Sequence, residues 1–180
     1  MLPAKKELVA NMSAEQQLVA IDREILLGLS VNLSPHKAAF EFFFKRNFLP
    51  LVTPCVWAVI KDTEEKSSDA DARRQAQIII QDTLDSLIVM PPITDTYNGV
   101  LDIHADALLA KNVLPRGDKV AALTLLEAIH LDATALLTTN PALRDAPPDK
   151  LKPALIDCGL HAIYIISPQQ IVEYLESQAG

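Results

Sequence analysis

Short apolar runs alternate along this chain with longer stretches in which apolar residues recur at helical spacing. Strands that are separated by helices pair in parallel, because each helix returns the chain across the sheet before the next strand begins. The pattern therefore predicts an α/β domain of three layers, α/β/α, around a mostly parallel central sheet of about five strands. The strands are expected at residues 18–22, 49–53, 87–91, 135–139 and 162–166.

The length of the chain favours one folding unit. It has 180 residues, of which 49% are hydrophobic, and this is enough for one sizeable core. We expect a single domain over residues 1–180, with 1–16 as an N-terminal extension or helix, a core of about 18–166, and 168–180 as a C-terminal helix and tail. The polar segment 61–74 is expected to be mostly an exposed loop between two helices.

Several function classes lack their usual sequence signals. The apolar stretches end well before the roughly 18–20 residues that a membrane span requires, and the start of the chain does not read as a secretory signal, so we expect a cytoplasmic protein without a membrane partner. Cys55 and Cys158 have no CxxC spacing, and the four histidines have no zinc-binding spacing. The net charge of −7 makes broad attraction to a nucleic-acid backbone weak, so that any such contact should be local.

All five phenylalanines lie in one short segment, "AAFEFFFKRNF". Phe40, Phe44 and Phe48 recur every four residues with Phe43 beside them, which predicts that they form the core-facing side of a helix. Phe42 is expected to point elsewhere, where it could belong to a contact with a protein or a nucleic acid.

Three polar residues stand near the ends of predicted strands. Asp22 ends the first apolar run, Asn140 follows the fourth, and Asp118 opens the helix that leads into that fourth strand. The carboxyl ends of parallel strands lie on one edge of a sheet, where the side chains just beyond them face a shared crevice. The alternative is structural, because Asp and Asn are good helix N-caps, each worth about 1 kcal/mol.

The order of these residues carries a resemblance to a known family. The segment "LVAIDREILLGL" resembles the opening strand and helix of PIN domains, in which an aspartate ends the first strand. The segment "GDKVAALTLLEAIHLDATALLTTNPAL" resembles the same family's later pattern, in which an aspartate opens an Ala-rich helix and the next strand ends in Thr-x-Asp or Thr-x-Asn. With "LPLVTPCVWAVIKD" between them, the resemblance extends from about residue 18 to residue 166.

The resemblance implies a nuclease site. PIN domains hold Mg²⁺ or Mn²⁺ with clustered carboxylates and hydrolyse phosphodiester bonds, usually in RNA, and such hard cations select oxygen ligands. By this resemblance Asp22 and Asp118 are the metal ligands, and Asp22, Asp118 and Asn140 are the catalytic residues, with Asn140 supplying a carbonyl oxygen or orienting a water. Lys119 or Arg144 would lie near the phosphates of an RNA substrate.

The sequence also departs from the family's pattern. Alignment places Val59, or its neighbour Ala58, where a metal-binding glutamate is expected, and neither side chain can bind a cation. Asp62 lies about 4.5 Å further along the same helix, which is too far to replace that glutamate in the octahedral site of Mg²⁺. Glu24 is an extra carboxylate close to Asp22 that could partly substitute.

Two functional hypotheses therefore stay open. The first is a ribonuclease that depends on Mg²⁺ or Mn²⁺ and has a depleted acidic site. The second is a catalytically inactive PIN-like module that binds a protein or RNA. The family includes toxins that are paired with small inhibitory proteins, and its members often pair through helices, so the resemblance also implies an inhibitory or regulatory protein partner and a homodimer.

Overall fold

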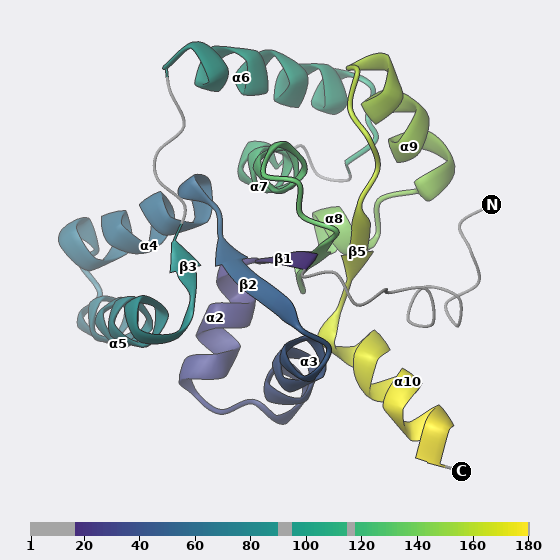
Figure 1. Ribbon diagram of the computed structural model, residues 1–180. Coiled ribbons are helices and arrows are strands. Elements are labelled where there is room, and N and C mark those ends of the chain that lie inside the picture. Colours follow the sequence, from purple (N-terminus) through teal and green to yellow (C-terminus); the bar gives the residue numbers. More distant parts are fainter. Residues whose placement is uncertain (1–16, 90–94, 115–117, 180) are drawn as a thin grey trace.

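A parallel five-stranded sheet forms the centre of the protein. The computed structural model describes residues 17–89, 95–114 and 118–179. Within this part the strand order is β3-β2-β1-β4-β5, and all neighbouring strands are parallel (Figure 1). The predicted sheet is confirmed. The strands are β1 (Gln17–Ile21), β2 (Phe48–Val52), β3 (Ile88–Val89), β4 (Ala135–Leu137) and β5 (Tyr164–Ile166).

Helices cover both faces of this sheet. One face packs against α6 (Asp95–Ala110), α7 (Lys119–His130), α8 (Pro141–Arg144) and α9 (Pro148–Asp157). The other face packs against α2 (Arg23–Ser30), α3 (Ser34–Lys45), α4 (Pro54–Lys66), α5 (Ala70–Ser86) and α10 (Pro168–Ala179). The three-layer α/β/α architecture therefore agrees with the prediction.

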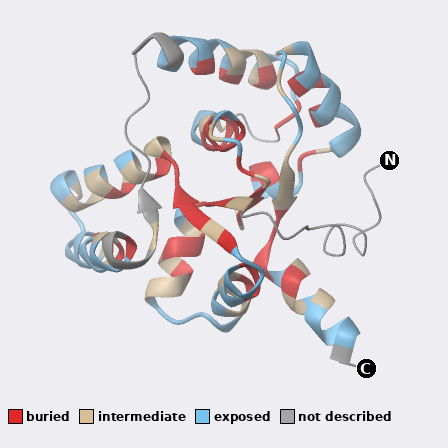
Figure 2. Ribbon diagram, viewed as in Figure 1, coloured by how far each residue is buried: buried red, intermediate tan, exposed pale blue. Residues whose placement is uncertain are grey.

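Alternation along the strands builds the two cores. In β1, Ala20 belongs to the core on the α7 side, whereas Val19 and Ile21 belong to the core on the α2 side. Leu136 and Leu137 of β4 divide in the same way. Successive side chains of a strand point to opposite faces, so a strand that is buried on both faces reads as a continuous apolar run. The central strands β1, β2 and β4 are accordingly largely buried (Figure 2).

Two local predictions were wrong. Segment 61–74 is mostly helical, because α4 continues to Lys66 and α5 begins at Ala70, where the Asp69 side chain accepts from the backbone N–H groups of Asp71 and Ala72. The polar residues of this segment lie on the exposed sides of α4 and α5, where a helix has the same composition as a loop.

The aromatic face of α3 was the second error. Phe42 is buried with Phe43 and Phe48, whereas 68% of Phe44 is exposed. The Phe42 ring packs edge-on against Phe43 and Tyr174, and the Arg46 guanidinium lies 3.7 Å from its centre. Docking of α10 against α3 turned the buried face by about one residue from the one that the spacing suggested.

Residues 1–16, 90–94, 115–117 and 180 lie outside the described part of the chain. The expected N-terminal extension or helix at residues 1–16 and the end of the third predicted strand, residues 90 and 91, belong to them. Among the described helices, none combines the length and the apolar character that a membrane crossing requires.

Candidate active site at the carboxyl edge of the sheet

Asp22 is fixed where β1 ends and α2 begins. Its backbone N–H donates to the Leu137 carbonyl at 3.1 Å, which continues the β1–β4 ladder by one residue. Its side chain is buried and accepts two hydrogen bonds, from the Arg23 backbone N–H at 2.7 Å and from the Thr138 hydroxyl at 2.5 Å. Asp22 is thus both the N-cap of α2 and a carboxylate held at the carboxyl edge of the sheet.

Asn140 and Asp118 meet beside it. Asp118 caps α7 through a hydrogen bond from the Ala121 N–H at 3.0 Å, and Asn140 caps α8 through one from the Ala142 N–H at 2.9 Å. The second oxygen of Asp118 accepts from the Asn140 amide nitrogen at 3.2 Å. Asp22, Asp118 and Asn140 are therefore helix N-caps, and their side chains also line one shared cleft, so the two interpretations of the sequence are compatible.

Thr138 joins the two halves of this arrangement. Its hydroxyl donates to Asp22 and accepts from the Asn140 backbone N–H at 2.9 Å, and its side chain is fully buried. A continuous hydrogen-bond network consequently runs from Asp22 through Thr138 and Asn140 to Asp118. The network spans the ends of two adjacent central strands, β1 and β4, and the start of α7.

The network opens into a cleft of about 560 Å³. Charged and amide groups of the cleft come from the starts of α2 and α7 and from the segment after β4, and its apolar lining comes from α4 and α7. The lining residues are Asp22, Arg23, Glu24, Val56, Val59, Asp118, Val120, Thr124, Thr139, Asn140 and Pro141.

The cleft decides whether Val59 or Ala58 of α4 stands at the position of the expected glutamate. Val59 lines it, whereas Ala58 is exposed and does not, so Val59 occupies the position where the resemblance expects a glutamate. Asp62 lies outside the cleft and forms an ion pair with Lys66 on the exposed side of α4. Glu24 lies in the cleft, but its carboxylate is 2.6 Å from the Arg23 guanidinium and is already paired.

The basic residues that were expected near phosphates lie elsewhere. Lys119 points to α6, where its ammonium group is 3.0 Å from Asp102 and 3.1 Å from Asp106. Arg144 pairs with Asp145 and lines a different cavity. Neither residue lines the cleft, and among the residues that line it the cation is Arg23.

Comparisons with known proteins bear on the fold. No family model and no curated protein matches the chain. A solved structure of VapBC2 from Rickettsia felis, bound to a DNA fragment from their promoter, superposes with a TM-score of 0.58. The identity is 14%, over 84% of this chain and 98% of that chain. The fold is PIN-like. At this identity the similarity concerns the arrangement of strands and helices and not the chemistry of the cleft.

Burial shapes the acid–base properties of the cleft. Burial raises the pKa of the Asp22 carboxyl, although the hydrogen bonds from Thr138 and from the Arg23 N–H oppose this rise. A carboxylate in this position is costly to ionise, and a nearby cation would offset that cost. The Cys55 thiol lies in the same surroundings, and burial together with the negative charge of Glu127 raises its pKa to about 11, so the thiol stays protonated at neutral pH.

Glu127 is a buried acid that the sequence did not single out. It lies on α7, and its carboxylate accepts from the Cys55 backbone N–H at 2.7 Å, close to the start of α4. Burial raises its pKa, and the hydrogen bond from Cys55 opposes this. Glu127 therefore ties α7 to the first turn of α4, the helix that carries Val59 into the cleft. The sequence does hold one signal for this role, since Glu127 lies in an Ala- and Leu-rich helix. An acid on the buried face of such a helix requires a polar partner.

The cleft offers few free oxygen donors to a divalent cation. Asp22 and Asp118 each offer carboxylate oxygens that have further lone pairs. The Asn140 carbonyl oxygen is used in capping α8, and its NH₂ group faces Asp118, so the expected carbonyl ligand is turned away. In the part of the chain that the structure describes, no group of three His, Cys, Asp or Glu side chains is placed to hold a metal ion. A multi-metal centre of high charge does not fit these residues.

Proposed function

We propose that this protein is a divalent-metal-dependent ribonuclease with a depleted acidic site. The supporting observation is the network that brings Asp22 and Asp118 from separate elements to one cleft and orients them through Thr138 and Asn140. Hydrogen bonds that hold side chains in fixed orientations give the precision that metal-assisted hydrolysis requires.

The excess of negative charge in the cleft favours binding of a cation, which a phosphate group would need in order to enter. Asp22, Glu24 and Asp118 carry three negative charges when ionised, and Arg23 carries one positive charge that is paired with Glu24. A phosphodiester entering such a cleft alone would be repelled. Mg²⁺ or Mn²⁺, held by Asp22 and Asp118, would stabilise charge on the phosphate and lower the pKa of a bound water.

Thr138 and Asn140 would act as positioning residues. Thr138 fixes the buried carboxylate of Asp22, and Asn140 fixes the orientation of Asp118. Asn140 is neutral, so the pair with Asp118 is satisfied without a metal, and affinity for the cation should be low.

A second candidate function rests on the apolar lining of the cleft. Val56, Val59 and Val120 present apolar surface where a metal site would need carboxylates. This surface favours a catalytically inactive PIN-like module that binds a protein. A regulatory or inhibitory partner, as in a toxin–antitoxin pair, would suit it, and the VapBC2 neighbour is itself a complex bound to DNA.

Calorimetry with Mn²⁺ and cleavage of a fluorescently labelled single-stranded RNA would separate these candidates. The native chain is compared with the double variant Asp22→Asn/Asp118→Asn, which keeps both helix caps because Asn caps as well as Asp. Asp69→Asn is the matched control, since Asp69 caps α5 outside the cleft.

The ribonuclease proposal expects weak Mn²⁺ binding and slow cleavage by the native chain and by Asp69→Asn, and neither by the double variant. If the native chain binds no Mn²⁺ at millimolar concentration, the ribonuclease proposal is wrong and the binding module stands. Cleavage that persists in the double variant would reflect a contaminating nuclease.

A further inference from the structure

A second cavity lies apart from the candidate active site. It has a volume of about 250 Å³ and is lined by residues of α7, α8, α9, β5 and the start of α10, and by the segment that leads into β5. It shares no lining residue with the cleft. Its interior is mainly aliphatic and includes Leu125, Leu143, Leu151, Leu155, Ile163 and Ile165.

The charged residues that line this cavity are both basic. Arg144 is bound through two nitrogens to the Asp145 carboxylate, at 2.7 and 2.9 Å, so its charge is largely neutralised. Lys152 is exposed on α9 and forms no ion pair with a described residue. Gln170 uses its side-chain oxygen to accept from the Ser167 N–H at 2.9 Å, which leaves its amide NH₂ group as a donor. The polar groups of the cavity are thus suited to an anion.

We propose that this cavity binds a small amphipathic anion, an aliphatic carboxylate of about eight carbons, with its chain among the leucines and isoleucines and its carboxylate at Lys152. At the roughly 30 Å³ that a water molecule occupies, the cavity holds about eight non-hydrogen atoms, which matches the eight carbons. The two carboxylate oxygens would then lie at its mouth beside the exposed Lys152. An apolar cavity with a few convergent polar groups is the usual form of a small-molecule site.

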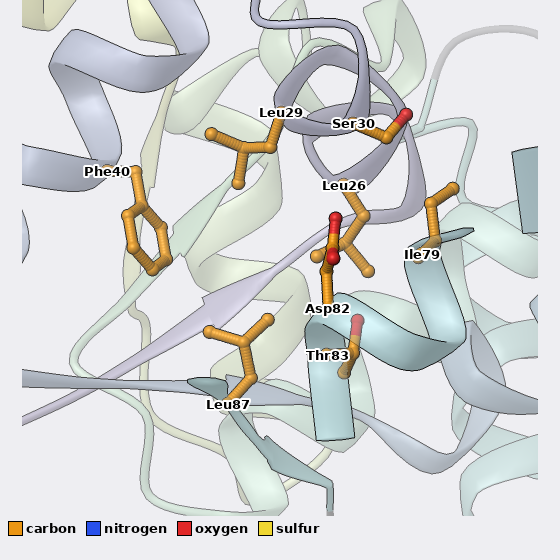
Figure 3. A pocket seen from close by; sticks show the side chains of 8 residues that line it. All are labelled: Leu26, Leu29, Ser30, Phe40, Ile79, Asp82, Thr83 and Leu87. Carbon is orange, nitrogen blue, oxygen red and sulfur yellow. The ribbon is translucent and has the colours of Figure 1, made fainter. Parts of the chain in front are cut away.

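A third cavity provides an internal comparison. It lies between α2, α3 and α5, has a volume of about 340 Å³, and is also lined by aliphatic side chains, including Leu26, Leu29 and Ile79 (Figure 3). Its charged residue is Asp82, whose carboxylate disfavours an anion. The two cavities therefore have similar apolar linings and opposite charge.

A peptide strand suits the second cavity less well than a small molecule. The adjacent edge strand, β5, has only three residues, and Tyr164 and Ile166 already direct backbone hydrogen bonds to the β4 side. A strand added at its free edge would gain few backbone hydrogen bonds, which are the main source of affinity in that mode of recognition.

The test is titration of the full chain with octanoate, followed by calorimetry and by methyl NMR. Weak, saturable binding in the submillimolar to millimolar range is expected for a ligand of this size. The perturbed methyl signals should be those of Ile163, Ile165 and Leu151. Octan-1-ol, which has the same chain without the charge, should bind about tenfold more weakly.

Variants then test where the carboxylate and the aliphatic tail of octanoate bind. Lys152→Gln should weaken octanoate binding about tenfold and leave octan-1-ol unchanged, whereas Lys150→Gln, an exposed lysine on the same helix that does not line the cavity, should have no effect. Ala162→Phe should block both ligands, because Ala162 is an exposed residue of the lining and can be enlarged without disturbing the core.

Three results would overturn the proposal. The first is no saturation by octanoate at about 10 mM, where a site of this affinity would be filled. The second is equal weakening by Lys150→Gln and Lys152→Gln, which would indicate nonspecific attraction. The third is perturbation of Leu26, Leu29 and Ile79 in place of the expected methyl groups.

Discussion

Replacing Asn140 by aspartate is the sharpest test of the charge arrangement in the cleft. The Asn140 NH₂ group donates to Asp118 at 3.2 Å, and the substitution places a second carboxylate oxygen at that position. Two unit charges at this separation repel by about 5 kcal/mol at an effective dielectric constant of about 20, and by about 1 kcal/mol in bulk water. The lost hydrogen bond adds about 1 kcal/mol. Both side chains are partly exposed, so we expect a destabilisation of about 2–4 kcal/mol at neutral pH without metal.

The same substitution should create a dependence on divalent cations. A destabilisation of this size lowers the melting temperature by about 5–15 °C in a chain of this length. A cation bound between the paired carboxylates restores about 2.7 kcal/mol when its concentration is a hundred times its dissociation constant. Thermal unfolding of Asn140→Asp, followed by circular dichroism, should therefore show a low melting temperature in EDTA and recovery in millimolar Mg²⁺ or Mn²⁺.

The control and the refuting results follow from the geometry. Asn47→Asp makes the same change of charge at an exposed residue in the left-handed region, which both Asn and Asp tolerate, and it should alter neither quantity. If Asn140→Asp melts like the native chain in EDTA, the two side chains do not face each other. A lowered melting temperature that no divalent cation reverses would show that the adjacent carboxylates cannot hold a metal.

Three further predictions test neighbouring positions. Val59→Glu should increase Mn²⁺ affinity about tenfold or more by adding a carboxylate to the cleft, whereas calorimetry of Ala58→Glu, outside the cleft, should show no gain. Thr138→Val should lower the free energy of unfolding in urea by about 2–4 kcal/mol, because it leaves a buried carboxylate and a backbone N–H without their partner, and Thr138→Ser should cost under about 1.5 kcal/mol. Glu127→Gln should raise the free energy of unfolding at neutral pH. The pKa of Glu127 is raised in the folded protein, so the native chain loses stability as the pH rises from the unfolded pKa through the folded one. Urea unfolding should therefore show the advantage of the Gln variant at pH 7 and its disappearance below about pH 4. A Glu127→Gln variant that is less stable than the native chain at pH 7 would contradict this reasoning.

The sheet could be predicted because its strands are buried on both faces. Short continuous apolar runs such as 18–21 and 135–137 favour buried parallel strands when helical stretches separate them. The helices were less predictable where tertiary packing decided the outcome. In α3 the contact with Tyr174 of α10 selected Phe42 for the core, and no local spacing encodes a contact between residues so far apart in sequence.

The cleft could be predicted in position but not in charge. Asp22 and Asn140 follow adjacent parallel strands, so topology alone places them at one edge. The partners of the lysines and arginines depend on side-chain directions. Lys119 follows Asp118 directly, yet successive helical residues point about 100° apart, and its ammonium group reaches α6. Glu127 and Thr138 were missed because their roles are contacts with Cys55 and Asp22, which are remote in sequence.

The helix caps explain why the geometry of the cleft says little by itself about catalysis. Asp22, Asp118 and Asn140 each begin a helix, and each cap stabilises its helix by about 1 kcal/mol whether or not a metal binds. Their convergence would therefore persist in a chain that no longer cleaves RNA. Val59 caps no helix, so its apolar side chain has no such structural role, whereas an aspartate in place of Asn140 would keep the cap of α8 but repel Asp118. The affinity of the cleft for a divalent cation, and its response to a carboxylate at either position, therefore distinguishes the nuclease from the binding module where the shape of the site cannot.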